Sequence, residues 1–116
     1  YGENGPSHLS INKAINIAKK RQLPTLFGSG DAKRNYIYVK DVAQAIVKCI
    51  EERINGIHYL GGEIKTIKAM LDDICDVFIP GQQPEYIKGE GAKDQIIENS
   101  DRFSITPFRK VLEKIK

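Results

Sequence analysis

The sequence predicts a mixed α/β fold, or α+β for this stretch in isolation, with about four helices around a small mixed sheet. Three observations predict it. Apolar residues recur at helical spacing in four segments, and short runs of β-branched or aromatic residues separate these segments. Glycine- and proline-containing breaks divide the two kinds of segment. With 116 residues, of which 41% are hydrophobic, the chain is long enough for one core.

The first helix is expected near residues 8–22, with Ser7 or Ser10 as its cap. Its apolar face consists of Ile11, Ala14, Ile15 and Ala18. Leu23-Pro24 ends the helix, because a proline disfavours helical backbone in the residue before it. Thr25 to Phe27 then form a short strand.

The middle of the chain predicts a turn, a strand and a second helix. Gly28-Ser29-Gly30-Asp31 suits a turn with positive φ angles, and the run from Tyr36 to Val39 has strand composition. Asp41 suits the start of a helix and is given no other role, and Asn55-Gly56 ends that helix. The apolar face of this helix is Val42, Ile46, Cys49 and Ile50.

The second half predicts two more strands and two more helices. Ile57 to Leu60 is expected to be a strand, Thr66 to cap the third helix, and Glu85 to Lys88 to form a strand. Thr106-Pro107 is expected to cap the last helix and supply its first residue. The apolar stripes are Ile67, Met70, Leu71, Ile74 and Phe78, then Phe108, Val111, Leu112 and Ile115. A small sheet cannot cover four such stripes, so we interpret the chain as part of a larger protein.

The composition excludes few functions, but its charge, apolar runs, cysteines and histidines indicate what kinds of ligand and location to expect. The formal charge of +3 favours an anionic ligand only weakly, and no apolar run reaches the roughly 20 residues that cross a bilayer. Cys49 and Cys75 are interpreted as buried thiols in a reducing compartment, which predicts a cytoplasmic location. His8 and His58 lack a placeable partner and are interpreted as structural, so no metal site is predicted.

The segment from Thr25 to Ala45 resembles the extended short-chain dehydrogenase/reductases, the family of NAD-dependent nucleotide-sugar epimerases, dehydratases and reductases. It follows the family pattern apolar-Gly-x-Gly-x-x-x-Arg-Asp-aromatic-apolar-His/Tyr-Val-x-Asp, with Asn35 in place of the aspartate after the arginine. Similar but weaker matches are Tyr1-Gly2, Gly56 to Gly62, Thr66, and the pair Asp94 and Asp101. The resemblance implies that residues 1–116 form the C-terminal, substrate-binding part, with the dinucleotide-binding domain outside this sequence.

The resemblance also implies site residues. Arg34 is expected to bind the diphosphate of a nucleotide-sugar, since a guanidinium donates paired hydrogen bonds to phosphate. Leu26 and Phe27 match the strand that flanks the base, although core packing explains Phe27 equally well. Tyr38 either faces the same pocket or packs beneath it. A second arginine of the family is replaced by Gly91, so the remaining candidates for phosphate contacts are the nearby lysines, Lys88 and Lys93.

The implied cofactor is NAD or NADP in the parent protein, with none bound by this segment, because no Gly-x-Gly-x-x-Gly opens a helix. Tyr36 and Lys40 have the spacing of the family's catalytic Tyr-x-x-x-Lys, but they lie in a predicted strand, so no catalytic residue is assigned. We expect the segment alone to be inactive and able to self-associate or form a homodimer, with no nucleic-acid or membrane partner. The alternative is a free-standing binding module for an anionic ligand or nucleic acid.

Overall fold

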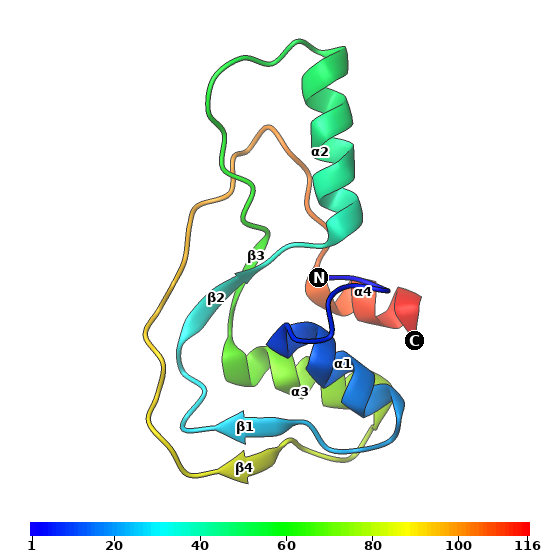
Figure 1. Ribbon diagram of the computed structural model, residues 1–116, viewed down its shortest axis with the longest axis vertical. Coiled ribbons are helices and arrows are strands. Elements are labelled where there is room, and N and C mark those ends of the chain that lie inside the picture. The colour runs from blue at the N-terminus through cyan, green and yellow to red at the C-terminus, as the bar shows by residue number, and fades with distance from the viewer.

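Four helices and four short strands make up the computed structural model, which describes all residues 1–116 (Figure 1). In chain order the elements are α1 (Ser10–Lys19), β1 (Thr25–Phe27), β2 (Lys33–Tyr36), α2 (Val39–Glu51), β3 (Glu63–Thr66), α3 (Ile67–Phe78), β4 (Glu85–Ile87) and α4 (Phe108–Ile115). The mixed α/β class with four helices is therefore confirmed. None of these helices is both long and apolar enough to cross a membrane.

The strands form two separate two-stranded sheets. β1 pairs in parallel with β4, and β2 pairs antiparallel with β3. Between β1 and β2 the chain reverses through Gly28 and Gly30, which both have positive φ, as the glycine turn predicts. This turn carries the chain from the β1–β4 sheet to the β2–β3 sheet.

The core lies between α1, α3 and α4, at the end of the molecule away from α2 (Figure 1). The predicted stripes of α3 and α4 fill it, and Phe108, Ile74, Val111 and Leu112 are completely buried. Thr66 caps α3 as predicted, because its hydroxyl oxygen accepts the Ala69 N–H at 3.0 Å. Helical periodicity therefore predicted the right helices where several helices pack together, and the predicted cap is confirmed for α3.

α2 stands apart from that core and extends the molecule to a length of 47 Å (Figure 1). Only Asp41 and Ala45 of this helix are buried. Ile46 and Ile50, from its predicted apolar face, are 56% and 72% exposed. The expected burial of Cys49 is also wrong, since its side chain is only partly covered.

Two carboxylates from distant elements hold the start of α4. Asp41 accepts the Thr106 N–H at 2.6 Å and the Thr106 hydroxyl at 2.8 Å. Glu63 of β3 accepts the Phe108 N–H at 2.7 Å. A carboxylate beside the first N–H groups of a helix is favourable because these groups have no partner within the helix. The interpretation of Asp41 as a helix-start residue alone is therefore incomplete.

The helix ends differ from prediction for local reasons. α1 begins at Ser10 rather than near residue 8, and its N-cap is Leu9, which makes no side-chain hydrogen bond. It ends at Lys19, two residues before Arg21 adopts a left-handed φ of 61°. At α4, Pro107 is the N-cap and not the first helical residue.

The predicted strand over Tyr36 to Val39 has the wrong bounds. β2 ends at Tyr36, and α2 already begins at Val39. The Ile37 carbonyl accepts from the Tyr1 amino group at 2.8 Å, and the Tyr38 carbonyl already accepts from Asp41 and Val42 of α2. One paired residue is too little for a ladder.

The predicted strand from Ile57 to Leu60 is also wrong. No strand lies alongside it, and Ile57 is 89% exposed. Its backbone makes one hydrogen bond, from the Ser100 N–H to the Tyr59 carbonyl at 2.8 Å, and His58 contacts the Asn55 carbonyl and the Phe103 ring. The strand of this region is β3 instead, because β2 is available there as a partner.

Candidate functional site

A cavity of about 470 Å³ opens beside β1 and β2. Its walls come from the start of α1, both strands, α3, and the loop after β4. The side chains that define its chemistry are Ser10, Phe27, Arg34, Tyr36 and Glu90. Most of the remaining lining is apolar. An apolar pocket with few polar groups is the usual form of a small-molecule site.

Arg34 brings the positive charge to this wall. It lies on β2 and is half-buried, and its Nη1 donates to the carbonyls of Lys33, at 3.0 Å, and Lys93. Both hydrogen bonds use the same nitrogen. The carbonyls thus fix the direction of the side chain while Nε and Nη2 remain available to a ligand. Two parallel donors on a planar group match the oxygens of a phosphate or carboxylate.

The start of α1 adds a second feature that favours an anion. Ser10 and Ile11 line the same cavity as Arg34. Because Leu9 provides no side-chain cap, the N–H groups of the first turn are not satisfied by a side chain. The partial positive charge of a helix N-terminus favours negative ligands. The cavity therefore combines one oriented guanidinium with one uncapped helix start.

The structure separates the predicted site residues into those at the cavity and those away from it. Arg34 and Phe27 line it, and Phe27 is 64% exposed, so core packing does not explain this phenylalanine. Leu26 and Tyr38 are buried members of the core cluster. Neither of these two side chains lines the cavity. Whether any of these side chains contacts a ligand stays a prediction.

The two candidate lysines do not line the cavity. Lys88 and Lys93 are both exposed, and neither side chain makes a recorded hydrogen bond or ion pair. The carbonyl of Lys93 nevertheless contributes, because it accepts from Arg34. Gly91 stands where the family pattern has its second arginine, and its neighbours Glu90 and Ala92 both line the cavity.

Tyr36 and Lys40 lack the arrangement of a catalytic pair. Tyr36 is the last residue of β2, whereas Lys40 lies in the first turn of α2, so they do not stand one turn apart on a helix. Burial raises the pKa of Tyr36, and the nearby Arg34 only partly opposes this. A proton-transferring tyrosine at neutral pH needs the opposite shift.

The glycine turn does not fit a dinucleotide. Gly28-Ser29-Gly30 leads from β1 into β2, whereas the pyrophosphate of a dinucleotide rests on a helix that begins directly after such a turn. No residue of this chain is therefore assigned to NAD. No group of three or more histidine, cysteine, aspartate or glutamate side chains lies together in a way that could hold a metal ion.

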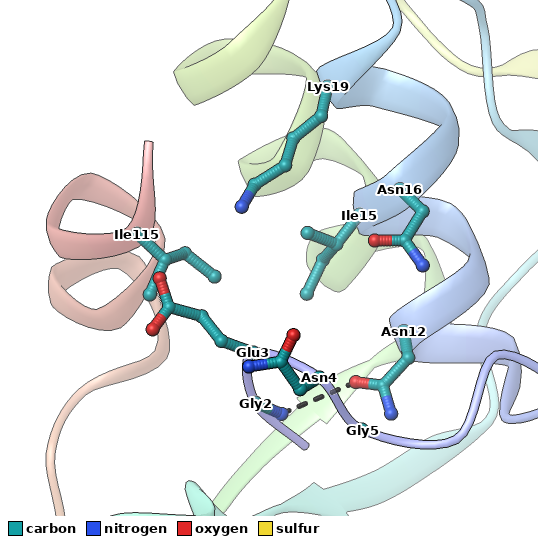
Figure 2. Close-up of a pocket in the computed structure, with 9 residues that line it drawn as sticks. All are labelled: Gly2, Glu3, Asn4, Gly5, Asn12, Ile15, Asn16, Lys19 and Ile115. Atoms are coloured by element: carbon teal, nitrogen blue, oxygen red, sulfur yellow. Dashed lines mark hydrogen bonds between the residues drawn. The ribbon is translucent and has the colours of Figure 1, made fainter.

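A second cavity, of about 430 Å³, is polar and lies on another face of α1 (Figure 2). The segment 2–5, the asparagines of α1 and Lys19 surround it. Its buried polar side chain, Asn12, accepts the Gly2 N–H at 3.3 Å and donates to the Pro6 carbonyl at 3.1 Å. Asn12 thus shapes the loop rather than offering a free group to a ligand. The cavity at Arg34 is the better candidate.

Ser10, Glu90 and Ala92 are cavity residues that the sequence did not reveal. They come from segments far apart in the chain, which only the folded arrangement brings to Arg34. The one signal in the sequence was Gly91, which replaces an arginine of the family pattern and so drew attention to this loop.

The fold and the cavity define an α/β protein with a site suited to an anionic, partly apolar small molecule. Comparison with known proteins identifies the family. The model of the NAD dependent epimerase/dehydratase family matches residues 1–61, more than half of the chain. The chain belongs to this family.

Solved structures resemble the chain over almost its whole length. UDP-N-acetylglucosamine 4-epimerase from Bacillus cereus has a TM-score of 0.83 and 23% identity, with 99% of this chain and 41% of that chain covered. UDP-N-acetylglucosamine 4-epimerase from Methanobrevibacter ruminantium, in complex with UDP-N-acetylmuramic acid, has a TM-score of 0.75 and 27% identity. The match covers 98% of this chain and 41% of that chain. dTDP-glucose 4,6-dehydratase from Bacillus anthracis, in complex with NAD, has a TM-score of 0.76 and 19% identity. The match covers 98% of this chain and 40% of that chain. This chain thus spans about two fifths of the length of each.

Proposed function

We propose that this chain is the nucleotide-sugar-binding part of an NAD(P)-dependent epimerase, dehydratase or reductase. In this proposal the dinucleotide-binding domain and the catalytic Tyr-x-x-x-Lys pair belong to residues outside 1–116. The cavity beside β1 and β2 receives the substrate. The single observation that carries the proposal is an oriented arginine, Arg34, in the wall of a largely apolar cavity.

Three features support a nucleoside diphosphate as the bound group. Arg34 offers paired donors, and the uncapped start of α1 at Ser10 offers backbone N–H groups to the same cavity. Phe27 exposes an aromatic ring at the cavity, which suits contact with a nucleotide base or ribose. Family membership and the UDP-N-acetylmuramic acid complex of the Methanobrevibacter relative agree with this class of ligand.

The role of this part is binding and orientation. Contacts to the diphosphate hold the substrate at a point remote from the reacting sugar, and that binding energy fixes the sugar relative to the cofactor. NAD or NADP, when bound by the parent, supplies the hydride chemistry. This assignment favours the enzyme over the alternative of a free-standing binding module for nucleic acid. The parent protein is proposed to form a homodimer through surfaces that include apolar residues exposed in this chain, such as Ile46 and Ile50.

Replacing Arg34 by alanine tests the proposal. In the full-length protein, Arg34→Ala is expected to weaken UDP binding by about 1.5–3 kcal/mol, the range for hydrogen bonds to charged groups, as measured by titration calorimetry. Arg102→Ala is the matched control, because Arg102 is exposed and its side chain makes no recorded hydrogen bond. Equal UDP affinities of the two variants would overturn the proposal.

A further inference from the structure

An exposed strap runs beside β2 and over Arg34. We define the strap as residues 93–97, which belong to the long segment between β4 and α4 (Figure 1). The strap's side chains are exposed, and only Ile96 and Ile97, at 48% and 47% exposure, have about half of their apolar surface covered. Its position depends on hydrogen bonds to β2.

Hydrogen bonds fasten the strap at three successive residues of β2. The Gln95 N–H donates to the Lys33 carbonyl at 3.0 Å, and the Lys33 N–H donates to Asp94 Oδ1 at 2.8 Å. Arg34 donates to the Lys93 carbonyl. The third residue, Asn35, makes the remaining two bonds with its side chain.

The Asn35 side-chain amide makes the two hydrogen bonds that a backbone peptide group would make to Ile97. Its Nδ2 donates to the Ile97 carbonyl at 2.9 Å, and its Oδ1 accepts the Ile97 N–H at 2.7 Å. An aspartate of the same shape accepts the N–H but places a second oxygen against the carbonyl. Only an amide of this size satisfies both partners. This position is therefore chemically specific, although it lies where the family pattern has aspartate.

Gly61 leaves the space that this pair needs. A Cβ at Gly61 would lie 2.5 Å from Asn35 Nδ2 and 2.9 Å from Ile97 Cγ1. Both distances are too short for real contacts. Gly61 has no positive φ, so an alanine there perturbs the Asn35–Ile97 pair without backbone strain.

We propose that Asn35 is a positioning residue that fastens the strap to β2 and thereby holds the Lys93 carbonyl that orients Arg34. The effect of Asn35 on ligand binding rests on the function proposed above. Its effect on the strap and on the arginine does not. Release of the strap removes one of the two acceptors of Nη1 and frees the side chain to turn away from the cavity.

The test compares Asn35→Asp, Asn35→Ala and Gly61→Ala in the full-length protein. Hydrogen exchange of peptides covering the strap is read by mass spectrometry, since exchange reports local opening. All three variants are expected to accelerate this exchange about tenfold, the effect of losing one to two hydrogen bonds. Asn16→Asp is the control, because it adds the same charge on an exposed face of α1. Unchanged exchange in Asn35→Asp would overturn the proposal.

Two further readouts separate this proposal from the proposed function. The rate at which phenylglyoxal modifies Arg34 is expected to rise about fivefold in Asn35→Asp, whether or not a ligand binds. An unchanged rate, with the strap released, would overturn the orienting role. Titration with UDP is expected to show affinity reduced in step with strap opening. If the wild-type protein fails to bind UDP, the proposed function fails, and exchange and modification still decide the role of Asn35.

Discussion

α2 and α3 have the same sequence character and opposite environments. Both are amphipathic helices of similar length, 13 and 12 residues. Six residues of α3 are buried, whereas α2 buries only Asp41 and Ala45. Helical periodicity therefore predicts the element but does not say what covers its apolar face. In α2 the apolar face is covered only in part, because Ala45 is buried while Ile46 and Ile50 stay largely exposed.

The largest expected contrast is in stability. Phe108→Ala in α4 removes a completely buried ring and is expected to cost about 3–5 kcal/mol in the free energy of unfolding, measured by urea denaturation. Ile50→Ala on α2, where the side chain is 72% exposed, is expected to change it by about 0.5 kcal/mol or less.

Measuring Phe108→Ala and Ile50→Ala in the full-length protein as well sharpens the comparison. A cost of several kcal/mol at Ile50 there would show that another part of the protein covers α2. Equal costs at Phe108 and Ile50 in the 116-residue chain would contradict the division between a packed core and an exposed helix.

Asp41 is the main polar link between the two regions. Its carboxylate is buried and accepts two hydrogen bonds from Thr106 before α4. Asp41→Ala is expected to destabilise the chain by about 1.5–3 kcal/mol in urea denaturation, because it leaves both donors unpaired. Glu51→Ala, at the exposed end of the same helix, is the control. A cost no larger than that of the control would mean that Asp41 does not link α2 to α4.

The reactivities of Cys75 in α3 and Cys49 in α2 compare the two regions without a mutation. Burial raises the pKa of the Cys75 thiol in α3 to about 11 from 9.0, and nearby Asp72 and Asp76 add to the shift. Since the thiolate is the reactive form, this shift lowers the thiolate fraction of Cys75 about 100-fold at pH 8. Cys49 in α2 is partly exposed. Iodoacetamide is therefore expected to label Cys49 first, as mass spectrometry would show, and preferential labelling of Cys75 would contradict the account.

Local signals predicted the parts of the fold that depend on local physics. The glycine turn, the Thr66 cap and the stripes of α3 and α4 need only neighbouring residues, and all are confirmed. The strand over Thr25 to Phe27 is confirmed, but the strands over Tyr36 to Val39 and Ile57 to Leu60 were wrong because a strand requires a partner. Ile57 to Leu60 has strand composition without a neighbouring strand, whereas the polar segment Glu63–Thr66 pairs with β2.

The candidate site was predictable only in part. Arg34 and Phe27 reach the cavity from the glycine-turn region, whose motif is local. Ser10 and Glu90 could not be found, because tertiary packing brings α1 and the loop after β4 to this cavity. The role of Asn35 could not be found either, since its hydrogen-bond partner, Ile97, lies far along the chain.

The most direct test of the central claim is a crystal structure of the full-length protein with UDP bound. The account predicts the diphosphate within hydrogen-bond distance of Arg34, beside the start of α1, with Phe27 near the base or ribose. A diphosphate bound in the polar cavity around Asn12, or anywhere else away from Arg34, would contradict it.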